Sequence, residues 1–268
     1  MQTSETAFLA TAARAAHLLV DGPPRILDDH LATALLGPRA GELLAYHRQH
    51  GDHPILAGAR AQTVVRSAFA EAALAEFVHR GPSRYVLLGA GLDSSPYRLD
   101  LPGVPIVEID HPATQSAKRA ALAAAGIDTS GVTFAPVDLS LPSQRSFVSW
   151  LGVVMYLSPA EVERKVADLA ATLAPGSELV FDHVLPPPLR DAAGNDYAAQ
   201  VSAVAAAGGE PWRSTWSPTD AAAMLSRHGW QVLAQPSTRT AVPAAMWERT
   251  DALRPLELAA LTHARLAA

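Results

Sequence analysis

Two glycines and two acidic residues follow short β-rich runs at a spacing that could hold a nucleoside. The first run, residues 85–89, continues into Gly89-Ala90-Gly91, where backbone without a Cβ at either glycine can come close to a ligand. The second run ends in Asp110, about 20 residues after the glycines, where a carboxylate can accept hydrogen bonds from ribose hydroxyls. The third run ends in Asp138. Either acid alone could merely cap a helix, but together these residues predict a site for a nucleoside-containing cofactor.

These residues can meet only if the strands that carry them are neighbours in one parallel sheet. After residue 81, short β-rich runs alternate with Ala-rich helical stretches, which is typical of a mainly parallel sheet covered on both faces. The carboxyl ends of such strands face one crevice, where open parallel sheets bind ligands. We expect strands at 85–89, 104–110, 132–138, 147–153, 177–184 and 229–233, a last strand near Met246 and Trp247, and helices at 111–125, 159–173 and 218–228.

The residues before the sheet have a helical pattern. Apolar residues recur at helical spacing through residues 1–80, with breaks at Gly22-Pro23-Pro24 and at 51–54. Residues 1–80 are therefore expected to form an N-terminal helical cap, and residues 81–268 a Rossmann-like core. A Pro-, Gly- and Ala-rich stretch interrupts that core and is expected to form a lid insertion at about 185–215.

Composition excludes several classes of function. The chain has 268 residues, 49% of them hydrophobic, which is enough to bury a full-sized core. Its 21 Lys and Arg against 26 Asp and Glu give a net charge of -5, so nucleic acid is not an expected partner. Because there is no cysteine, thiolate chemistry and Cys-ligated metals are excluded, and no metal is expected. No apolar run approaches the roughly 20 residues of a membrane span, and no secretion signal is visible, so a cytoplasmic protein is expected.

Several longer motifs occur in an order that resembles a known family. They are LLGAGLDSSPYRL at 87–99, VEIDHPATQSAK at 107–118, APVDLS at 135–140, FVSWLGVVMYLS at 147–158 and APGSELVFDH at 174–183. In these motifs the chain resembles the bacterial branch of the leucine carboxyl methyltransferase family. The resemblance implies an S-adenosylmethionine-dependent methyltransferase of the α/β class, with a Rossmann-like class I fold and a seven-stranded, mostly parallel sheet.

The resemblance also assigns cofactor-binding residues by position. Either Arg60 or Arg66 would meet the methionine carboxylate, and Asp110 would hold the ribose in a turn that His111 orients. Eukaryotic members of the family carry a glutamate for the cofactor amine where this chain has Leu151, so the partner of the amine stays open. The remaining assigned residues are Gly89, Ala90 and Gly91 beside the methionine and ribose, and Asp138 with Leu139 beside the adenine.

Methyl transfer is an in-line displacement from a sulfonium, in which positioning the acceptor supplies much of the rate. A carboxylate acceptor is already ionised at neutral pH, whereas a phenol or alcohol acceptor would benefit from a general base. His183, at the end of the fifth expected strand, is the candidate base, although a structural role is the more common one for such a histidine. Tyr156 is the other polar candidate. We expect an O-methyltransferase acting on a small molecule, such as a carboxylic acid of secondary metabolism.

Two other functions fit part of the pattern. A nicotinamide-dependent oxidoreductase would need a third glycine in the first turn, where this chain has Ser94 and Ser95. A non-catalytic protein could keep the cofactor fold without an acceptor site. Arg14 and His17 could line the pocket from the first helix or form a solvated face.

One feature disagrees with the resemblance. In the strand order 3-2-1-4-5, the connection between the third and fourth strands spans roughly 22 Å. Only residues 140–146 are available for it, and fully extended they reach about 23 Å. A crossover normally contains a helix, and members of the family usually have about a helix more here. We therefore expect residues to be missing from the chain at this connection.

Overall fold

The computed structural model describes residues 4–81, 83–137 and 141–268, and its centre is a seven-stranded sheet. The strand order is β3-β2-β1-β4-β5-β7-β6, with the first five strands parallel and β7 antiparallel to both its neighbours. This confirms the predicted α/β class and class I methyltransferase sheet. The strands are β1 (Arg84–Leu88), β2 (Ile106–Ile109), β3 (Val132–Ala135), β4 (Ser146–Trp150), β5 (Glu178–Val184), β6 (Trp230–Ala234) and β7 (Ala259–Leu266).

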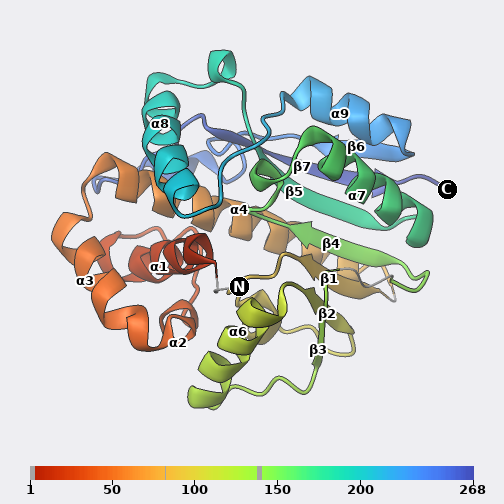
Figure 1. Cartoon of the computed structure of the whole chain (residues 1–268), viewed down its shortest axis with the longest axis horizontal. Coiled ribbons are helices and arrows are strands. Elements are labelled where there is room, and N and C mark those ends of the chain that lie inside the picture. The colour runs from red at the N-terminus through yellow and green to blue at the C-terminus, as the bar shows by residue number, and fades with distance from the viewer. Residues whose placement is uncertain (1–3, 82, 138–140) are drawn as a thin grey trace.

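Helices cover both faces of the sheet (Figure 1). The N-terminal part contains α1 (Glu5–Val20), α2 (Ala32–Leu35), the short 3-10 helix η1 (Gly37–Arg39), α3 (Ala40–His50) and α4 (Pro54–Val78). The later helices are α5 (Ser95–Arg98), α6 (Pro112–Ala124), η2 (Val154–Tyr156), α7 (Pro159–Thr172), η3 (Pro187–Leu189), α8 (Ala192–Ala207), α9 (Pro218–Arg227) and η4 (Ala244–Trp247). None of the helices among the described residues is long and apolar enough to cross a bilayer.

Successive side chains of β1 point to opposite faces of the sheet, and the core accordingly has two layers. Val86 and Leu88 pack with residues of α7 and α9 on one face, and Tyr85 and Leu87 pack with residues of α4 on the other. All five residues of β1 are buried, as expected for a strand inside a sheet with helices on both sides. The strand is therefore a rigid support for the turn that follows it.

Helix α7 begins where its sequence predicts. The Ser158 hydroxyl accepts a hydrogen bond from the backbone of Glu161, and the Glu161 carboxylate accepts one from the Ser158 N–H at 2.7 Å. Pro159 occupies the first turn, where its missing N–H has no intrahelical partner to lose. The first turn of α7 is therefore defined by its capping residues, and it follows the segment that connects β4 to this helix.

The last strand differs from the prediction. Met246 and Trp247 lie in the short helix η4, and the Trp247 indole N–H donates to the Arg239 carbonyl at 2.9 Å. The last strand is instead β7, which the sequence did not predict because its residues, AALTHARL, have little intrinsic β-propensity. It forms because it lies between β5 and β6, with registered pairs running from Glu178 opposite Arg265 to Val184 opposite Ala259.

The connection from β3 to β4 passes beside β2 and β1, as the strand order requires. Its described parts, 136–137 and 141–145, contain no helix, and Leu141 joins the core beside β2 and β4. The expectation that residues are missing between Leu139 and Phe147 stays a prediction: Leu139 and Ser140 lie outside the described residues, and residues 141–147 are described. The division into a cap over 1–80, a core over 81–268 and a lid at about 185–215 stays a prediction, although α8 does lie between β5 and α9.

Candidate functional site

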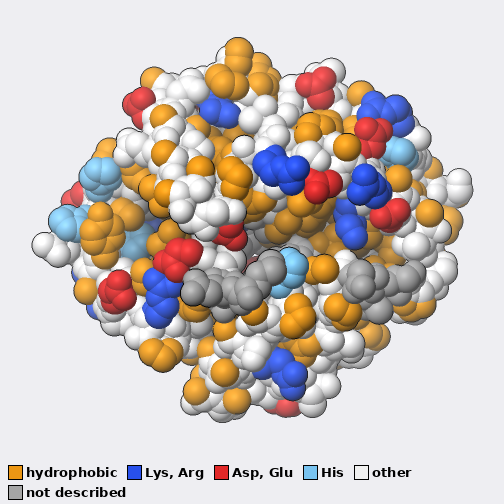
Figure 2. Space-filling model, viewed as in Figure 1, with side chains coloured by type: hydrophobic (Ala, Val, Ile, Leu, Met, Phe, Trp, Pro, Cys, Tyr) orange, Lys and Arg blue, Asp and Glu red, His pale blue; other side chains and the backbone are white. Residues whose placement is uncertain are grey.

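A large pocket opens where the carboxyl ends of β1, β2, β4 and β5 meet α1, α4 and α8. Its volume is about 910 Å³, near the upper end of the range for small-molecule sites. Figure 2 shows the face of the molecule hollowed near its centre, with acidic and basic side chains interspersed around the hollow. The crevice at the ends of the parallel strands is therefore the candidate site, as the sequence predicts.

The glycine turn after β1 forms one wall of this pocket. Gly89 and Gly91 have φ values of +63° and +48°, which favour glycine, and Ala90 lies between them in the wall. A Cβ on Gly89 would lie 2.5 Å from Cγ2 of Val153, so a side chain from the β4 loop already approaches this backbone closely. Gly89 therefore lacks a Cβ for a packing reason, its contact with Val153, and it also lines the pocket. Its close approach to a ligand stays a prediction.

Asp110 follows β2 and faces the same space. Its carboxylate accepts hydrogen bonds from the backbone N–H groups of Gly91 and His111, both at 2.6 Å. The residue is 9% exposed, and both Asp110 and His111 line the pocket. Two backbone donors hold the carboxylate in place, and each oxygen keeps lone pairs for a further donor such as a hydroxyl group.

Of the two arginines predicted to meet the methionine carboxylate, Arg66 on α4 is the one that lines the pocket. Its Nη1 lies 3.4 Å from Oδ2 of Asp182, a buried residue of β5. The other candidate, Arg60, is wrong: it is 1% exposed, binds Asp21 through Nε and Nη2 at 2.8 and 2.9 Å, and is absent from the lining. It faces the packing between α1, α3 and α4, where the buried Asp21 neutralises its charge.

His183 is a second correction. It is fully buried, lies outside the pocket lining and hydrogen-bonds the Trp216 carbonyl and the Thr262 hydroxyl, both at 3.0 Å. Because the carbonyl can only accept, Nδ1 carries the proton and Nε2 accepts from Thr262. Burial lowers the pKa of His183 to about 4. Both ring nitrogens are engaged behind the pocket wall, so this imidazole cannot reach an acceptor.

Tyr156, in η2, does line the pocket. Burial raises the pKa of its hydroxyl, so the group is protonated at neutral pH and acts as a hydrogen-bond donor rather than a base. Leu151 also lines the pocket and offers only an apolar side chain to it. Asp138 and Leu139 lie outside the described residues, and their neighbour Val137 is in the pocket wall.

The sequence prediction missed two acidic residues of the wall, Asp182 and Glu210. Asp182 was not a candidate, although a carboxylate near the carboxyl end of a fully buried strand is a signal for a function. Glu210 was also missed, and it accepts a hydrogen bond from Thr6 at 2.7 Å across the pocket mouth. Arg14 does line the pocket, but it is buried, pairs with Asp29 at 2.8 Å and donates to the Leu92 carbonyl at 2.7 Å. It fixes α1 to the glycine turn, and neither it nor the fully buried His17 forms a solvated face.

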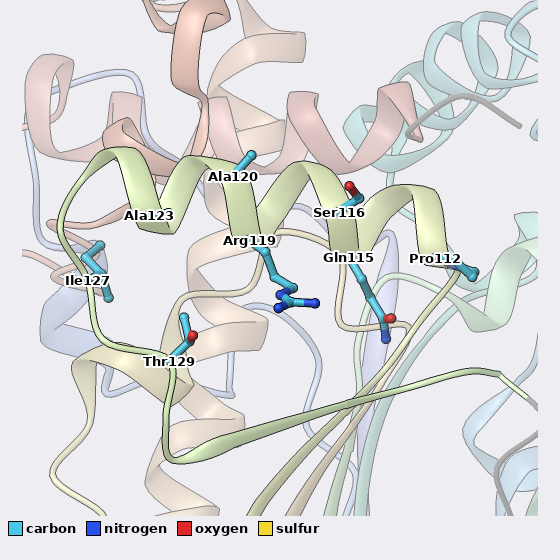
Figure 3. A pocket seen from close by; sticks show the side chains of 8 residues that line it. All are labelled: Pro112, Gln115, Ser116, Arg119, Ala120, Ala123, Ile127 and Thr129. Atoms are coloured by element: carbon cyan, nitrogen blue, oxygen red, sulfur yellow. The ribbon is translucent and has the colours of Figure 1, made fainter.

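A second hollow of about 500 Å³ lies along α6 (Figure 3). Arg119 stacks on the Phe134 ring, 5.3 Å from its centroid, and the Gln115 amide donates to the Ala135 carbonyl at 2.6 Å. Gln115 and Arg119 are thus already engaged by the protein itself, and the walls come from α6 and the following loop rather than from the strand ends. This hollow is not the candidate site.

The groups in the large pocket fit S-adenosylmethionine. That cofactor has a ribose diol, a carboxylate, an ammonium group and a sulfonium cation. The pocket offers a fixed carboxylate at Asp110, a cation at Arg66 and a further carboxylate at Asp182. Together with the strand order, this defines a class I methyltransferase that uses S-adenosylmethionine.

Comparison with known proteins gives the family. The sequence profile of the leucine carboxyl methyltransferase family matches residues 7–170. This chain belongs to that family. It is 27% identical over 263 residues to "Putative S-adenosyl-L-methionine-dependent methyltransferase YktD" of Bacillus subtilis (strain 168), covering 85% of this chain and 86% of that protein. A protein of Mycolicibacterium smegmatis, also named "Putative S-adenosyl-L-methionine-dependent methyltransferase", is 30% identical over 273 residues, covering 87% of this chain and 82% of that protein.

Solved structures share the fold. A possible exported protein from Bordetella parapertussis superposes with a TM-score of 0.57 at 18% identity, covering 100% of this chain and 98% of that chain. Magnesium protoporphyrin IX methyltransferase from Synechocystis, solved with bound S-adenosylhomocysteine, superposes with a TM-score of 0.51 at 16% identity, covering 78% of this chain and 87% of that chain. The family match and the named relatives confirm the methyltransferase class and its cofactor, and the solved structures confirm the fold.

Proposed function

We propose that the protein transfers the methyl group of S-adenosylmethionine to an oxygen atom of a small molecule. The observation that carries this proposal is the shape of the pocket, which extends beyond the carboxyl ends of β1 and β2 into an apolar compartment. That compartment is formed by a cluster of side chains from η2, β5, α8 and the segment before β7, including Met155, Val184, Tyr197 and Leu258. An acceptor with an apolar body fits such a wall.

The cofactor would lie against the strand ends. Asp110 would accept hydrogen bonds from the ribose hydroxyls, in a turn oriented by His111, and the backbone of Gly89, Ala90 and Gly91 would lie beside the methionine and ribose. Arg66 would pair with the methionine carboxylate, and Leu151 would contact the cofactor through its apolar side chain. Asp138 and Leu139 remain proposed neighbours of the adenine.

The acceptor oxygen would meet two donors. Trp212 lies in the pocket wall, and its indole N–H is buried with no hydrogen-bond partner among the described residues. The Tyr156 hydroxyl, protonated at neutral pH, lies near that indole. Leaving a buried donor unpaired is unfavourable by about 1–3 kcal/mol, and an acceptor oxygen placed beside Trp212 would recover that energy.

A carboxylate is the first choice of acceptor. The expected base, His183, lies behind the pocket wall, and Tyr156 keeps its proton, so neither can activate a hydroxyl. A carboxylate needs no activation, and its oxygen can attack the methyl group in line with the departing sulfur once it is held near it. A hydroxyl acceptor is the second candidate and would require a different base from the pocket wall.

The test is methyl transfer from labelled S-adenosylmethionine to a panel of aromatic and aliphatic carboxylic acids and their hydroxyl counterparts. Products are then treated with mild alkali, which releases the label from methyl esters as methanol and leaves methyl ethers intact. We expect alkali-labile product, and a reduced kcat with Tyr156→Phe. Alkali-stable product would favour the hydroxyl acceptor, and transfer to nitrogen or carbon would overturn the proposal.

We further propose that the protein acts in the cytoplasm, in secondary metabolism, with neither nucleic acid nor a membrane as partner. The net charge of -5 supports the first of these exclusions, because a polyanion would be repelled. The helical cap over residues 1–80 and the lid at about 185–215 would close over the bound acceptor.

A further inference from the structure

Arg66 of α4 and Asp182 of β5 carry opposite charges inside the pocket. The side chains are 19% and 5% exposed, and the Nη1 to Oδ2 distance of 3.4 Å is long for an ion pair. Arg66 lines the pocket, and among the described residues its guanidinium makes no other hydrogen bond, so four of its five N–H donors have no protein acceptor. Such a pair is loosely joined and can accept a ligand between its members.

The backbone of Gly152 holds Asp182 in place and leaves room for Arg66. Its N–H donates to Oδ1 of Asp182 at 2.5 Å, which fixes the carboxylate while leaving Oδ2 directed at Arg66. A Cβ on Gly152, whose φ is +69°, would lie 2.6 Å from Nη2 of Arg66. The glycine of the W-L-G sequence is therefore needed for the guanidinium to lie over this turn.

The other aspartates, glutamates and arginines of the pocket wall are already engaged, whereas Lys165, also in the wall, forms no ion pair among the described residues. Among the carboxylates, Asp110 accepts from two backbone N–H groups, Asp93 accepts from the Ser95 N–H at 2.7 Å, and Glu210 accepts from Thr6 at the pocket mouth. Arg14 is committed to Asp29 and to the Leu92 carbonyl. Among these lining carboxylates, Asp182 is the one whose partner is an arginine of the pocket wall, and the contact is long enough for a ligand cation to replace that arginine.

We propose that Asp182 binds the ammonium group of the methionine moiety while Arg66 binds its carboxylate. The zwitterion of an α-amino acid has the same two charges at the same short separation, so it can replace one long contact by two charge-assisted hydrogen bonds. The inference rests on the proposed cofactor site. It gives the amine a partner in a chain where Leu151 offers only an apolar side chain.

The experiment measures the affinity of three ligands by calorimetry: S-adenosylhomocysteine, its analogue without the amino group and its analogue without the carboxylate. We expect Asp182→Asn to weaken S-adenosylhomocysteine binding about 10- to 100-fold and to leave the amine-free analogue unchanged. The amide oxygen of this variant can still accept from the Gly152 N–H, so the turn is kept. Arg66→Gln should weaken S-adenosylhomocysteine and the amine-free analogue but not the carboxylate-free one.

Glu178→Gln is the matched control, because Glu178 is the other acid of β5 and pairs with Arg80, Arg265 and His263 away from the pocket. It should leave all three affinities unchanged. Equal losses for S-adenosylhomocysteine and the amine-free analogue with Asp182→Asn would reduce Asp182 to a support for Arg66 and overturn the inference.

The unaltered protein provides a test that does not depend on any variant folding. If it binds the amine-free analogue as tightly as S-adenosylhomocysteine, no residue reads the amine and the inference is wrong. If it binds none of the three ligands, the proposed cofactor site itself fails, which is a separate result.

Discussion

Replacing Asp110 with alanine should weaken both cofactor binding and the fold, by amounts of similar size that can be measured separately. The carboxylate is held by the N–H groups of Gly91 and His111 at 2.6 Å each, so its loss removes two hydrogen bonds, each with a net contribution of about 1 kcal/mol. We therefore expect the free energy of unfolding to fall by about 2 kcal/mol. Hydrogen bonds to a charged group contribute about 1.5–3 kcal/mol, so S-adenosylhomocysteine should bind roughly 10- to 150-fold more weakly.

Calorimetric titration of the folded variant measures the second effect, and denaturant unfolding measures the first. Asp110→Asn should fall between the two proteins, because its amide oxygen can replace one carboxylate oxygen and its NH2 group cannot accept from the second N–H. Asp100→Ala, at an exposed position outside the pocket wall, should change neither quantity. An unchanged affinity in a folded Asp110→Ala protein would remove this residue from the site and refute the reasoning.

Three further predictions follow from the packing. Gly89→Ala should lower the free energy of unfolding by at least about 1–2 kcal/mol because φ at this position is +63°. Adding Val153→Ala should relieve the clash between the new Cβ and Cγ2 of Val153 but not the backbone strain. Urea unfolding of the single and double variants would separate the two effects. Lys118→Met should lower the free energy of unfolding by about 3–5 kcal/mol, because Lys118 Nζ lies 2.7 and 2.8 Å from the two oxygens of the fully buried Glu108, which would lose its partner. A second change, Glu108→Leu, should restore part of this loss. The folded pKa of His183, about 4, is below the unfolded value of 6.5, so its stabilising contribution is complete above pH 6.5 and falls by up to about 1.4 kcal/mol per pH unit down to pH 4. The variant His183→Gln should remove this dependence of the unfolding free energy on pH and keep methyl transfer at pH 7. A loss of turnover with intact cofactor affinity would instead make His183 a catalytic residue.

The parallel half of the sheet could be predicted because its residues agree at every level. Runs such as 85–89 are rich in β-formers, end in glycine or an acid and are separated by helices with clear boundaries such as Ser158-Pro159. Strand β7 could not be predicted, because AALTHARL has little β-propensity and becomes a strand only between β5 and β6. Long-range pairing determines it, and a local pattern does not show long-range pairing.

The candidate site divides in the same way. The place of Gly89 and Asp110 in the pocket wall could be predicted because each directly follows a strand, and parallel strand ends converge. Arg60 and Arg66 are six residues apart on α4, and their sequence contexts do not reveal that Arg60 pairs with Asp21 away from the pocket while Arg66 lines it. His183 and Asp182 are neighbours on β5 whose side chains point to opposite faces, so an error of one position exchanges the pocket residue for a buried one.

The central claim is that the carboxyl ends of β1, β2, β4 and β5 hold S-adenosylmethionine with its ribose on Asp110. The most direct measurement is a crystal structure of the protein with S-adenosylhomocysteine. The account predicts the ribose hydroxyls within about 2.5–3.2 Å of the Asp110 carboxylate and the methionine carboxylate beside Arg66. Density for the ligand along α6 or elsewhere on the surface, with the strand ends empty, would contradict it.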